Sequence, residues 1–478
     1  MQLLNCFAKS LKSWQKKYSV TGQVPLMVGI FTLGLIAYNS NLIQASEYKQ
    51  QVKGQRIKLT LAVHSGEKEA WKELARMLGE KHKNIDLVIK EEQYDFKTAA
   101  QGSDIIYTDI IWLPEFVKNK VVQPIDNQMI RKFGVNNVNE FITKKGFLKS
   151  EIEHGKYPPT GDTRLYRIPF RTDAGLLYYR QDLLTEYGKS VPKTYGELIA
   201  TANDIMSREK QKRPGRRFYG YLWQGLGEGS TTMFLEVLHG YGGFWIKDWE
   251  KDNAKKVGLQ HKEGIDAIKF LRETLKKKIS IGIGDSVSED VTDRSFIEGD
   301  AVFLRSWANV WARSKSSESS VSDKIGFTAM VGKTSATKTS CQGGWGLAIS
   351  RKLPKDKLDA AITAIDFLTS YQSQKEFTLR QGTLPTRRGL FNDPAIIGKY
   401  PHYPKLLGII NQYVVSRPRT LKYDDLSKIL QNTLTSALDL TKDDETVRKI
   451  MWQGGDLTRN CLDEKKTTCI TQGSLVKP

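Results

Sequence analysis

The sequence is poor in the residues that build metal centres and disulfide scaffolds. Its 478 residues include only four cysteines, none of them in C-x-x-C spacing, and six histidines without an H-E-x-x-H motif. Disulfide-rich domains and cysteine-based zinc modules need more cysteines at closer spacing. We therefore expect no metal site and no other bound cofactor.

Common catalytic signatures are also missing. The chain has no P-loop and no G-x-S-x-G elbow, and the stretch 225–229 lacks the third glycine of a G-x-G-x-x-G motif. Adjacent acids such as Glu289 and Asp290 occur, but chance alone produces such pairs among 53 acidic residues. These absences weaken an enzymatic function without excluding it.

Positive charge, in contrast, is in excess. Lysine and arginine number 73 against 53 acids, which gives a formal net charge of +20. A charge of this size suggests a polyanionic partner such as nucleic acid. The hydrophobic content of 39% is ordinary for a globular protein. At roughly 100–200 residues per domain, the length suggests two or three domains.

Residues 1–46 are typical of a secretory signal. Four lysines and no acid accompany an apolar run, Val24–Tyr38, and small residues follow with a candidate cut after Ala45. The run is shorter than the about 20 residues that a spanning helix needs, so a permanent anchor is the alternative. Loss of the four lysines leaves +16, and an exported protein seldom meets nucleic acid.

Strands and helices are expected to alternate in the remaining chain. Apolar residues alternate with polar ones over 57–63, which predicts a strand. Over residues 71–78 apolar side chains recur at helical spacing, which predicts a helix. Further strands are expected at 87–89 and 104–111, which completes a β-α-β unit. Strands at 176–179 and 343–350 follow, with helices from Thr194, over 258–278 and over 358–368. No single linker divides this α/β chain, so we expect two interleaved domains.

Aromatic residues stand beside acids, amides and glycines at several turn-like places. These are Tyr107–Trp112, Trp223–Gly225, Tyr241–Trp245, Arg305–Asn309 and Gln342–Trp345. Aromatic rings pack against the apolar faces of a sugar ring, while carboxylates and guanidinium groups bind its hydroxyls. Each ring taken singly is better explained as core. Together they indicate carbohydrate recognition.

The segment Ile168–Leu184, IPFRTDAGLLYYRQDLL, resembles the sugar-binding proteins of bacterial ABC importers, the family 1 extracellular solute-binding proteins. The similarity is strongest to their trehalose/maltose-binding branch and extends in family order over about residues 57–440. Its other segments are Asp104–Val117, Tyr219–Gly225, Phe234–Trp245, Phe296–Trp307, Cys341–Ser350, Phe377–Pro394 and Ser416–Thr420. The resemblance implies a periplasmic-binding-protein fold, in which two α/β lobes joined by a hinge close on a ligand in the cleft between them.

The resemblance also implies how the chain is divided. Residues 51–170 and 348–412 are expected to form lobe I, and residues 171–347 and 413–440 to form lobe II. Residues 441–478 would be a C-terminal extension.

Site residues follow from their positions in the family's motifs. Asp109 and Asp173 are expected to accept hydroxyls of the sugar, while Trp307 and Trp345 stack on or wall its ring. The remaining expected contacts are Glu67, Trp223, Trp245, Gly344 and Arg417.

Two positions depart from the family's pattern. Arg171 stands where a closely related maltose/trehalose binder has an aromatic residue, and Asn309 stands where a stacking tyrosine is common. Both are kept as expected contacts, and they favour a disaccharide or a smaller polar glycoside over a long malto-oligosaccharide.

The function implied is that of an exported, non-enzymatic binding protein of an ABC transporter. It would capture a sugar of the trehalose, sucrose, maltose or glucosylglycerol type and deliver it to permease subunits in the cytoplasmic membrane. We expect a periplasmic monomer without a nucleic-acid partner, and tethering by an uncleaved signal is the alternative. The rival functions are a secreted glycoside-processing enzyme that uses cleft carboxylates and a polycationic surface protein.

The cysteines carry two further expectations. Cys341, beside the expected site, is predicted to be a free and buried thiol. Cys461 and Cys469 are close in sequence and, in an oxidising compartment, can close a short C-terminal loop. Sequence alone leaves open whether they pair.

Overall fold

The computed structural model describes residues 56–92, 95–135, 137–249, 256–281, 287–463 and 469. The predicted signal over residues 1–46 lies outside the described residues. Within the described chain, residues 58–81 and those from Ile85 onward form one compact unit. Ile57 and residues 82–84 belong to a second unit. In this second unit, the Ile57 amide donates to the Asn84 carbonyl at 2.7 Å. None of the helices in the described part of the chain has the length and apolarity that crossing a membrane requires.

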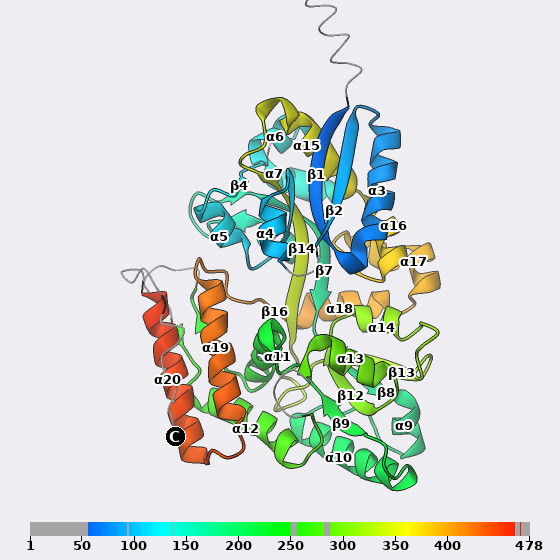
Figure 1. Cartoon of the computed structure of the whole chain (residues 1–478), viewed down its shortest axis with the longest axis vertical. Helices are drawn as coiled ribbons and strands as arrows, with labels where there is room; N and C mark the ends of the chain where they lie inside the picture. The colour runs from blue at the N-terminus through cyan, green and yellow to red at the C-terminus, as the bar shows by residue number, and fades with distance from the viewer. Residues whose placement is uncertain are drawn as a thin grey trace, which may run out of the picture. The chain divides into compact units, whose positions relative to one another are not determined.

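Two sheets of the described chain have more than two strands, and eight strands form the larger of them (Figure 1). Its order is β15-β7-β14-β3-β1-β2, and β4 and β16 also pair with β14. The strands are β1 (Ile57–His64), β2 (Ile85–Glu92), β3 (Ile105–Asp109), β4 (Val122–Gln123), β7 (Arg167–Ala174), β14 (Ser340–Ser350), β15 (Leu384–Pro385) and β16 (Val414–Val415). β1 and β3 are parallel, whereas β14 is antiparallel to β3 and β7. The predicted β-α-β start is confirmed, with α3 (Lys68–Lys81) and α4 (Phe96–Gln101) as connections.

Four strands form the smaller sheet, in the order β13-β8-β12-β9. They are β8 (Leu176–Arg180), β9 (Tyr219–Leu222), β12 (Ala301–Ser306) and β13 (Ile325–Ala329). Only Gly175 separates β7 from β8, so the chain passes from one sheet to the other at this residue. A Cβ atom at Gly175 would lie 1.7 Å from Glu236 Oε1, which explains why the crossing uses glycine.

Most other residues of the described chain belong to helices and short hairpins. The helices after α4 are α5 (Leu113–Lys118), α6 (Asp126–Phe133), α7 (Val138–Lys145), α8 (Lys149–Glu153), α9 (Gln181–Glu186), α10 (Tyr195–Lys212), α11 (Gly227–Gly240), α12 (Lys262–Lys276), α13 (Glu289–Ile297), α14 (Asn309–Arg313), α15 (Leu358–Leu368), α16 (Tyr371–Gln381), α17 (Pro394–Lys399), α18 (Tyr403–Tyr413), α19 (Tyr423–Leu438) and α20 (Asp444–Leu462). Two-stranded hairpins are β5 (Lys156–Tyr157) with β6 (Arg164–Leu165) and β10 (Ile246–Lys247) with β11 (Lys256–Val257). Single 3-10 turns are η1 (Ser65–Glu67), η3 (Lys355–Lys357) and η4 (Arg388–Asn392).

Several helix boundaries match the sequence-based prediction. The Thr194 side chain caps α10 by accepting the Glu197 amide at 3.2 Å. The helix predicted over 358–368 is α15. The helix predicted over 258–278 is shorter, because α12 begins at Lys262 and ends at Lys276.

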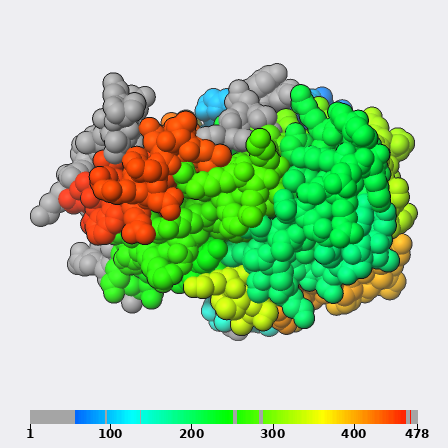
Figure 2. Space-filling model, turned by 90° about the horizontal axis from the view of Figure 1, so that it is seen from below, coloured from blue at the N-terminus to red at the C-terminus, as the bar shows by residue number. Residues whose placement is uncertain are grey.

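One hydrophobic core joins the helices beside the smaller sheet to the C-terminal helices. Buried residues of α10, α11 and α12 belong to the same cluster as Leu430 of α19 and Ile450 of α20. Figure 2 shows the orange-red C-terminal helices lying against green segments of the chain. Residues 444–462 of the predicted extension thus contribute to this core, while the lobe boundaries themselves stay a prediction.

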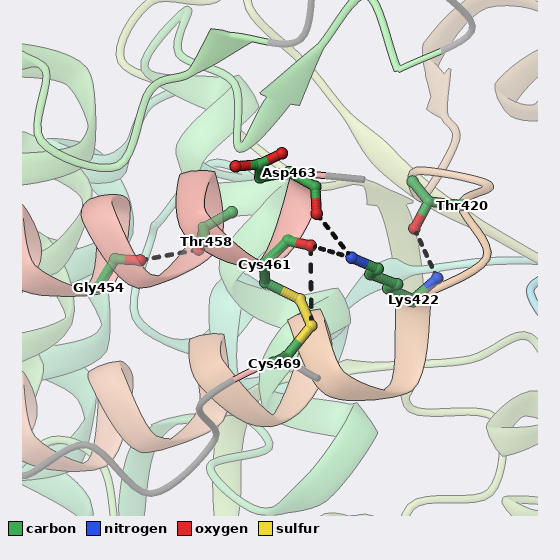
Figure 3. Close-up of a disulfide and its surroundings, with 7 residues drawn as sticks. All are labelled: Thr420, Lys422, Gly454, Thr458, Cys461, Asp463 and Cys469. Atoms are coloured by element: carbon green, nitrogen blue, oxygen red, sulfur yellow. Dashed lines mark hydrogen bonds between the residues drawn. A yellow bond between two sulfur atoms is a disulfide. The ribbon is translucent and has the colours of Figure 1, made fainter. Parts of the chain in front are cut away.

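The end of α20 carries a disulfide between Cys461 and Cys469 (Figure 3). Lys422 Nζ donates to the Cys461 carbonyl at 2.8 Å and to the Asp463 carbonyl at 3.0 Å, which holds this end of α20 beside the start of α19. Cys341 is a free, buried thiol as predicted. Burial raises the pKa of Cys341 to about 12, so this thiol is unreactive.

Candidate functional site

A cavity of about 680 Å³ is lined by strands of the larger sheet and by helices that flank the smaller one. The larger sheet contributes the end of β3 and the middle of β7 and β14. The first residues of α11 and α13 line it from the other side, together with the connection between β12 and α14. Arg417, which lies between β16 and α19, also lines the cavity, as do residues around η1, Arg313 of α14, and Gln381 and Thr383 near the end of α16.

Most of the residues predicted from the sequence come together at this cavity. Its lining includes Glu67, Asp109, Arg171, Asp173, Trp307, Asn309, Gly344, Trp345 and Arg417. They come from segments up to 350 residues apart in the chain, which agrees with the interleaved organisation. Their contact with a ligand remains a prediction.

Trp345 stands at the centre of a row across the larger sheet. On β14 it is the direct partner of Asp109 on β3 and of Arg171 on β7. The guanidinium of Arg171 lies 5.4 Å from the centroid of the Trp345 ring, and His64 meets that ring edge-on at 4.7 Å. A planar ring, an acid and a planar cation are therefore presented side by side.

Arg171 is held in place by three side chains. Its Nε donates to the Tyr107 hydroxyl at 2.7 Å, and its terminal nitrogens lie 3.2 Å from Glu67 Oε1 and 3.8 Å from Asp173 Oδ2. These contacts fix the guanidinium in the wall of the cavity.

Asp173 connects β7 to the smaller sheet. Its Oδ1 accepts the amides of Ala174 at 2.9 Å and Ala308 at 3.2 Å, which leaves Oδ2 on the side of Arg171. Burial raises the pKa of Asp173, and the positive charge of Arg171 acts in the opposite direction.

Arg417 bridges an acid of the larger sheet and an acid of a helix beside the smaller sheet. One terminal nitrogen donates to Asp109 Oδ1 of β3 and the other to Glu228 Oε1 of α11, both at 3.0 Å. Arg417 is only 3% exposed, and of its two partners Asp109 is largely buried, whereas the Glu228 side chain is 38% exposed. Glu228 was missed in the sequence, where nothing distinguishes it from other acids near glycines.

Trp307 is positioned by an acid that was also missed. Its Nε1 donates to Glu289 Oε2 at 3.1 Å, and the Arg305 guanidinium lies 4.5 Å from the centroid of its ring. Glu289 belongs to the acid pair that the sequence offered only as a chance event. In the structure it is the first residue of α13 and lines the cavity.

Gly344 lies where a side chain does not fit. A Cβ atom there would lie 2.9 Å from Glu151 Oε2, and Glu151 is completely buried. Glycine therefore lets β14 approach the carboxylate beneath the cavity.

Trp223 and Trp245 correct the sequence-based set, because neither lines this cavity. Their exposed fractions are 0% and 1%, and both rings belong to the core beside the smaller sheet. Trp223 Nε1 donates to Thr274 Oγ1 at 3.1 Å, which satisfies its only donor. Trp245 borders a separate cavity of about 450 Å³. We leave both out of the candidate site.

The arrangement suits noncovalent recognition of a polyhydroxylated ligand. Indole faces offer apolar surface, and the carboxylates and guanidinium groups offer hydrogen-bond acceptors and donors. Within the described residues, no group of histidine, cysteine, aspartate and glutamate is arranged to hold a metal ion.

Two sheets that share a cavity of this composition define a two-lobed binding protein of the periplasmic type. The chain belongs to the bacterial extracellular solute-binding proteins, whose family profile matches residues 64–375. Members of this family are binding proteins and not enzymes, in agreement with the missing catalytic signatures. Its fold is the periplasmic-binding-protein fold that the sequence predicts.

Similar proteins support this assignment. A probable ABC transporter-binding protein of Deinococcus radiodurans is 28% identical over 282 residues, which are 58% of this chain and 64% of that protein's length. The solved structure of maltose-bound MalE3 of T. maritima is 26% identical with a TM-score of 0.71, covering 84% of this chain and 99% of that one. The GacH receptor of Streptomyces glaucescens, solved unliganded and with acarbose, is 20% identical with a TM-score of 0.70, covering 86% and 99%.

Proposed function

We propose that the protein is the exported substrate-binding protein of an ABC transporter and that its ligand is a disaccharide or a small glycoside. Trehalose, sucrose, maltose and glucosylglycerol are the candidate ligands. Binding would close the two lobes over the sugar, and the closed monomer would deliver it to permease subunits in the cytoplasmic membrane.

The observation that carries this proposal is the row formed by Asp109, Trp345 and Arg171. Trp345 is the direct cross-strand partner of both Asp109 and Arg171, and all three residues line one cavity. An indole offers apolar surface to the C–H face of a pyranose, while a carboxylate and a guanidinium beside it bind the equatorial hydroxyls. A metabolite without hydroxyls would cover these charged groups without offering them hydrogen bonds.

The size of the cavity favours a compact ligand. Its 680 Å³ falls within the about 300–1,000 Å³ that is common for small-molecule sites. Arg171 stands where the family's pattern has an aromatic residue, and in the cavity wall it pairs with Glu67 and donates to the Tyr107 hydroxyl. A long malto-oligosaccharide needs several successive ring platforms, so a disaccharide is the better fit.

The proposed location and partners follow from the family and from the N-terminal sequence. An extracellular binding protein acts outside the cytoplasm, and residues 1–46 are the expected export signal. A Lys-rich exterior suits work near an anionic membrane surface. We propose that the protein is periplasmic, with an uncleaved signal as a tether in the alternative form.

Isothermal titration calorimetry with trehalose, sucrose, maltose and glucosylglycerol tests the proposal. We expect one of them to bind with a stoichiometry of one and to be recovered intact from the complex. Turnover of the sugar would instead favour a glycoside-processing enzyme. Binding of polyanions alone, lost at moderate salt, would favour a polycationic surface protein.

A further inference from the structure

The cavity holds more carboxylates than cations. Its acidic side chains are Glu67, Asp109, Asp173, Glu228 and Glu289, and its basic ones are Arg171, Arg313 and Arg417. No lysine lines the cavity among the described residues. An anionic ligand would therefore enter a cavity whose lining already carries an excess of negative charge.

Each guanidinium of the lining is already engaged. Arg171 lies 3.2 Å from Glu67, and Arg417 lies 3.0 Å from both Asp109 and Glu228. Arg313 lies 2.7 Å from Asp293, which is completely buried. A phosphate or carboxylate of a ligand would compete with these protein carboxylates for the guanidinium groups, and an acid displaced from its pair would lack that partner.

Glu289 differs from the other acids of the lining because it has no ion-pair partner within the described chain. Its Oε2 accepts the indole N–H of Trp307 at 3.1 Å, which leaves Oε1 for a ligand. The neighbouring Arg305 is bound by both oxygens of Glu236, at 2.7 and 2.8 Å. Glu289 is thus the acid of the lining that combines the lack of an ion-pair partner among the described residues with an acceptor oxygen, Oε1, for which no hydrogen bond is found there.

The electrostatics at this end of the cavity point in the same direction. Burial raises the pKa of Glu289; Arg305 and the Trp307 hydrogen bond act against this, and the charge of Asp173 adds to it. The negative charge of Asp173, which helps to raise the pKa of Glu289, would also disfavour an anionic group bound beside Glu289. A hydroxyl or a protonated amine would instead donate to Oε1.

We propose that Glu289 is a ligand-binding residue that selects glycosides without an anionic group over phosphorylated or carboxylated ones. This inference rests on the proposed function, because it presumes that the cavity takes a sugar. It names both a contact that the sequence does not reveal and the charge class of the ligand.

The test compares neutral ligands with anionic ones, and a variant that removes a charge inside the cavity with one that removes a charge outside it. The neutral probes are trehalose, sucrose, maltose and glucosylglycerol, and their anionic counterparts are trehalose 6-phosphate, sucrose 6-phosphate, maltose 1-phosphate and glucosylglycerate. Glu289→Gln removes the charge but keeps an oxygen that accepts the Trp307 N–H. Asp290→Asn removes a charge from the exposed neighbour outside the lining and serves as control.

Calorimetric Kd values give the outcome. We expect the parent to bind a neutral sugar at least about tenfold more tightly than its anionic counterpart, and Glu289→Gln to narrow this ratio about threefold or more. Asp290→Asn should leave the ratio unchanged. If Glu289→Gln fails to fold, as judged by circular dichroism, the ratio in the parent still tests the selectivity.

Three results would contradict different parts of the proposal. Equal or tighter binding of the anionic partner by the parent overturns the inference and leaves the sugar-binding function standing. An unchanged ratio in folded Glu289→Gln overturns the role of Glu289. If the parent binds neither class, the proposed function is wrong, and the inference falls with it.

Discussion

Trp345 and Asp173 are the side chains of the cavity whose loss we expect to weaken sugar binding. Trp345 offers a face that a smaller residue cannot replace, and Asp173 is a buried acceptor fixed by two backbone amides. We expect Trp345→Ala and Asp173→Ala each to weaken binding about tenfold or more, which corresponds to about 1.4 kcal/mol. Calorimetry with the sugar found by screening measures the effect.

The control for the indole is Trp452→Ala on α20, where the side chain is 55% exposed and remote from the cavity lining. It should bind like the parent. Circular dichroism checks that every variant is folded. Parental affinity in both cavity variants would show that the site lies elsewhere.

Asp293, behind the cavity wall, is expected to make stability depend on pH. Burial and the negative charge of Glu289 raise the pKa of Asp293 from 3.8 to about 7, against the effect of Arg313. Between these values the folded state holds a proton that the unfolded state releases, so stability falls as pH rises from about 4 to 7. Above pH 7 the loss is complete.

Asp293→Asn removes this titration and keeps an oxygen for Arg313. Between pH 5 and 8 the parent should lose on the order of 2 kcal/mol of unfolding free energy relative to the variant. Urea unfolding at several pH values measures the difference. Parallel pH profiles for parent and variant would contradict the raised pKa.

The residues of the site were predictable only where a motif fixes both residue type and direction. Asp109, Asp173 and Trp345 lie on strands in segments that resemble a family, and their positions imply one face of a sheet. Glu289 is recognisable only once α13 is placed beside Trp307. Trp223 shows the reverse error, since an indole beside glycines looks the same in sequence whether it faces a ligand or a core.

At the scale of elements, local patterns were sufficient for strands and helices but not for their pairing. Alternating apolar residues predicted β1, and helical spacing predicted α3 and α15. The insertion of β14 between β3 and β7 joins segments more than 160 residues apart. No local pattern encodes that pairing, and it was not predicted from the sequence.

One arginine secures the connection between two C-terminal helices. Arg272 of α12 is 2% exposed and donates to the carbonyls of Ala437 and Asp439, both at 2.7 Å, and of Lys442 at 2.6 Å. These carbonyls belong to the end of α19 and the turn before α20. Such carbonyls have no partner within the helix, so the guanidinium satisfies them.

We expect Arg272→Met to lower the free energy of unfolding by about 3 kcal/mol, because it leaves buried carbonyls without donors. Lys276→Met, one turn further along α12 and exposed, should change it little. Urea unfolding measures both. Sugar affinity should stay at the parental level in both variants, because neither residue lines the cavity. Equal stability of the two variants would show that water replaces the guanidinium.

For the whole molecule, the important contact is the one by which Arg417 joins Asp109 of β3 to Glu228 of α11. Asp109 belongs to the larger sheet, whereas Glu228 begins a helix beside the smaller one, and both bind the same guanidinium. Because Arg417 is buried, its loss would leave Asp109 and Glu228 without the cation that lies between them, which costs more than the loss of one partner of a surface pair. The same residue lines the cavity, so a ligand and the bridge share one group.

Small-angle X-ray scattering of the sugar-free protein tests this bridge. We expect Arg417→Met to increase the radius of gyration relative to the parent, because neither Asp109 nor Glu228 retains a partner across the cavity. Arg313→Met removes the same charge from the same cavity, but Arg313 binds only Asp293 on its own side, so the radius should stay at the parental value. If the radius increases in both variants, the loss of a positive charge and not of the bridge is the cause. If it increases in neither, the Arg417 pairs do not hold the two sides of the cavity together.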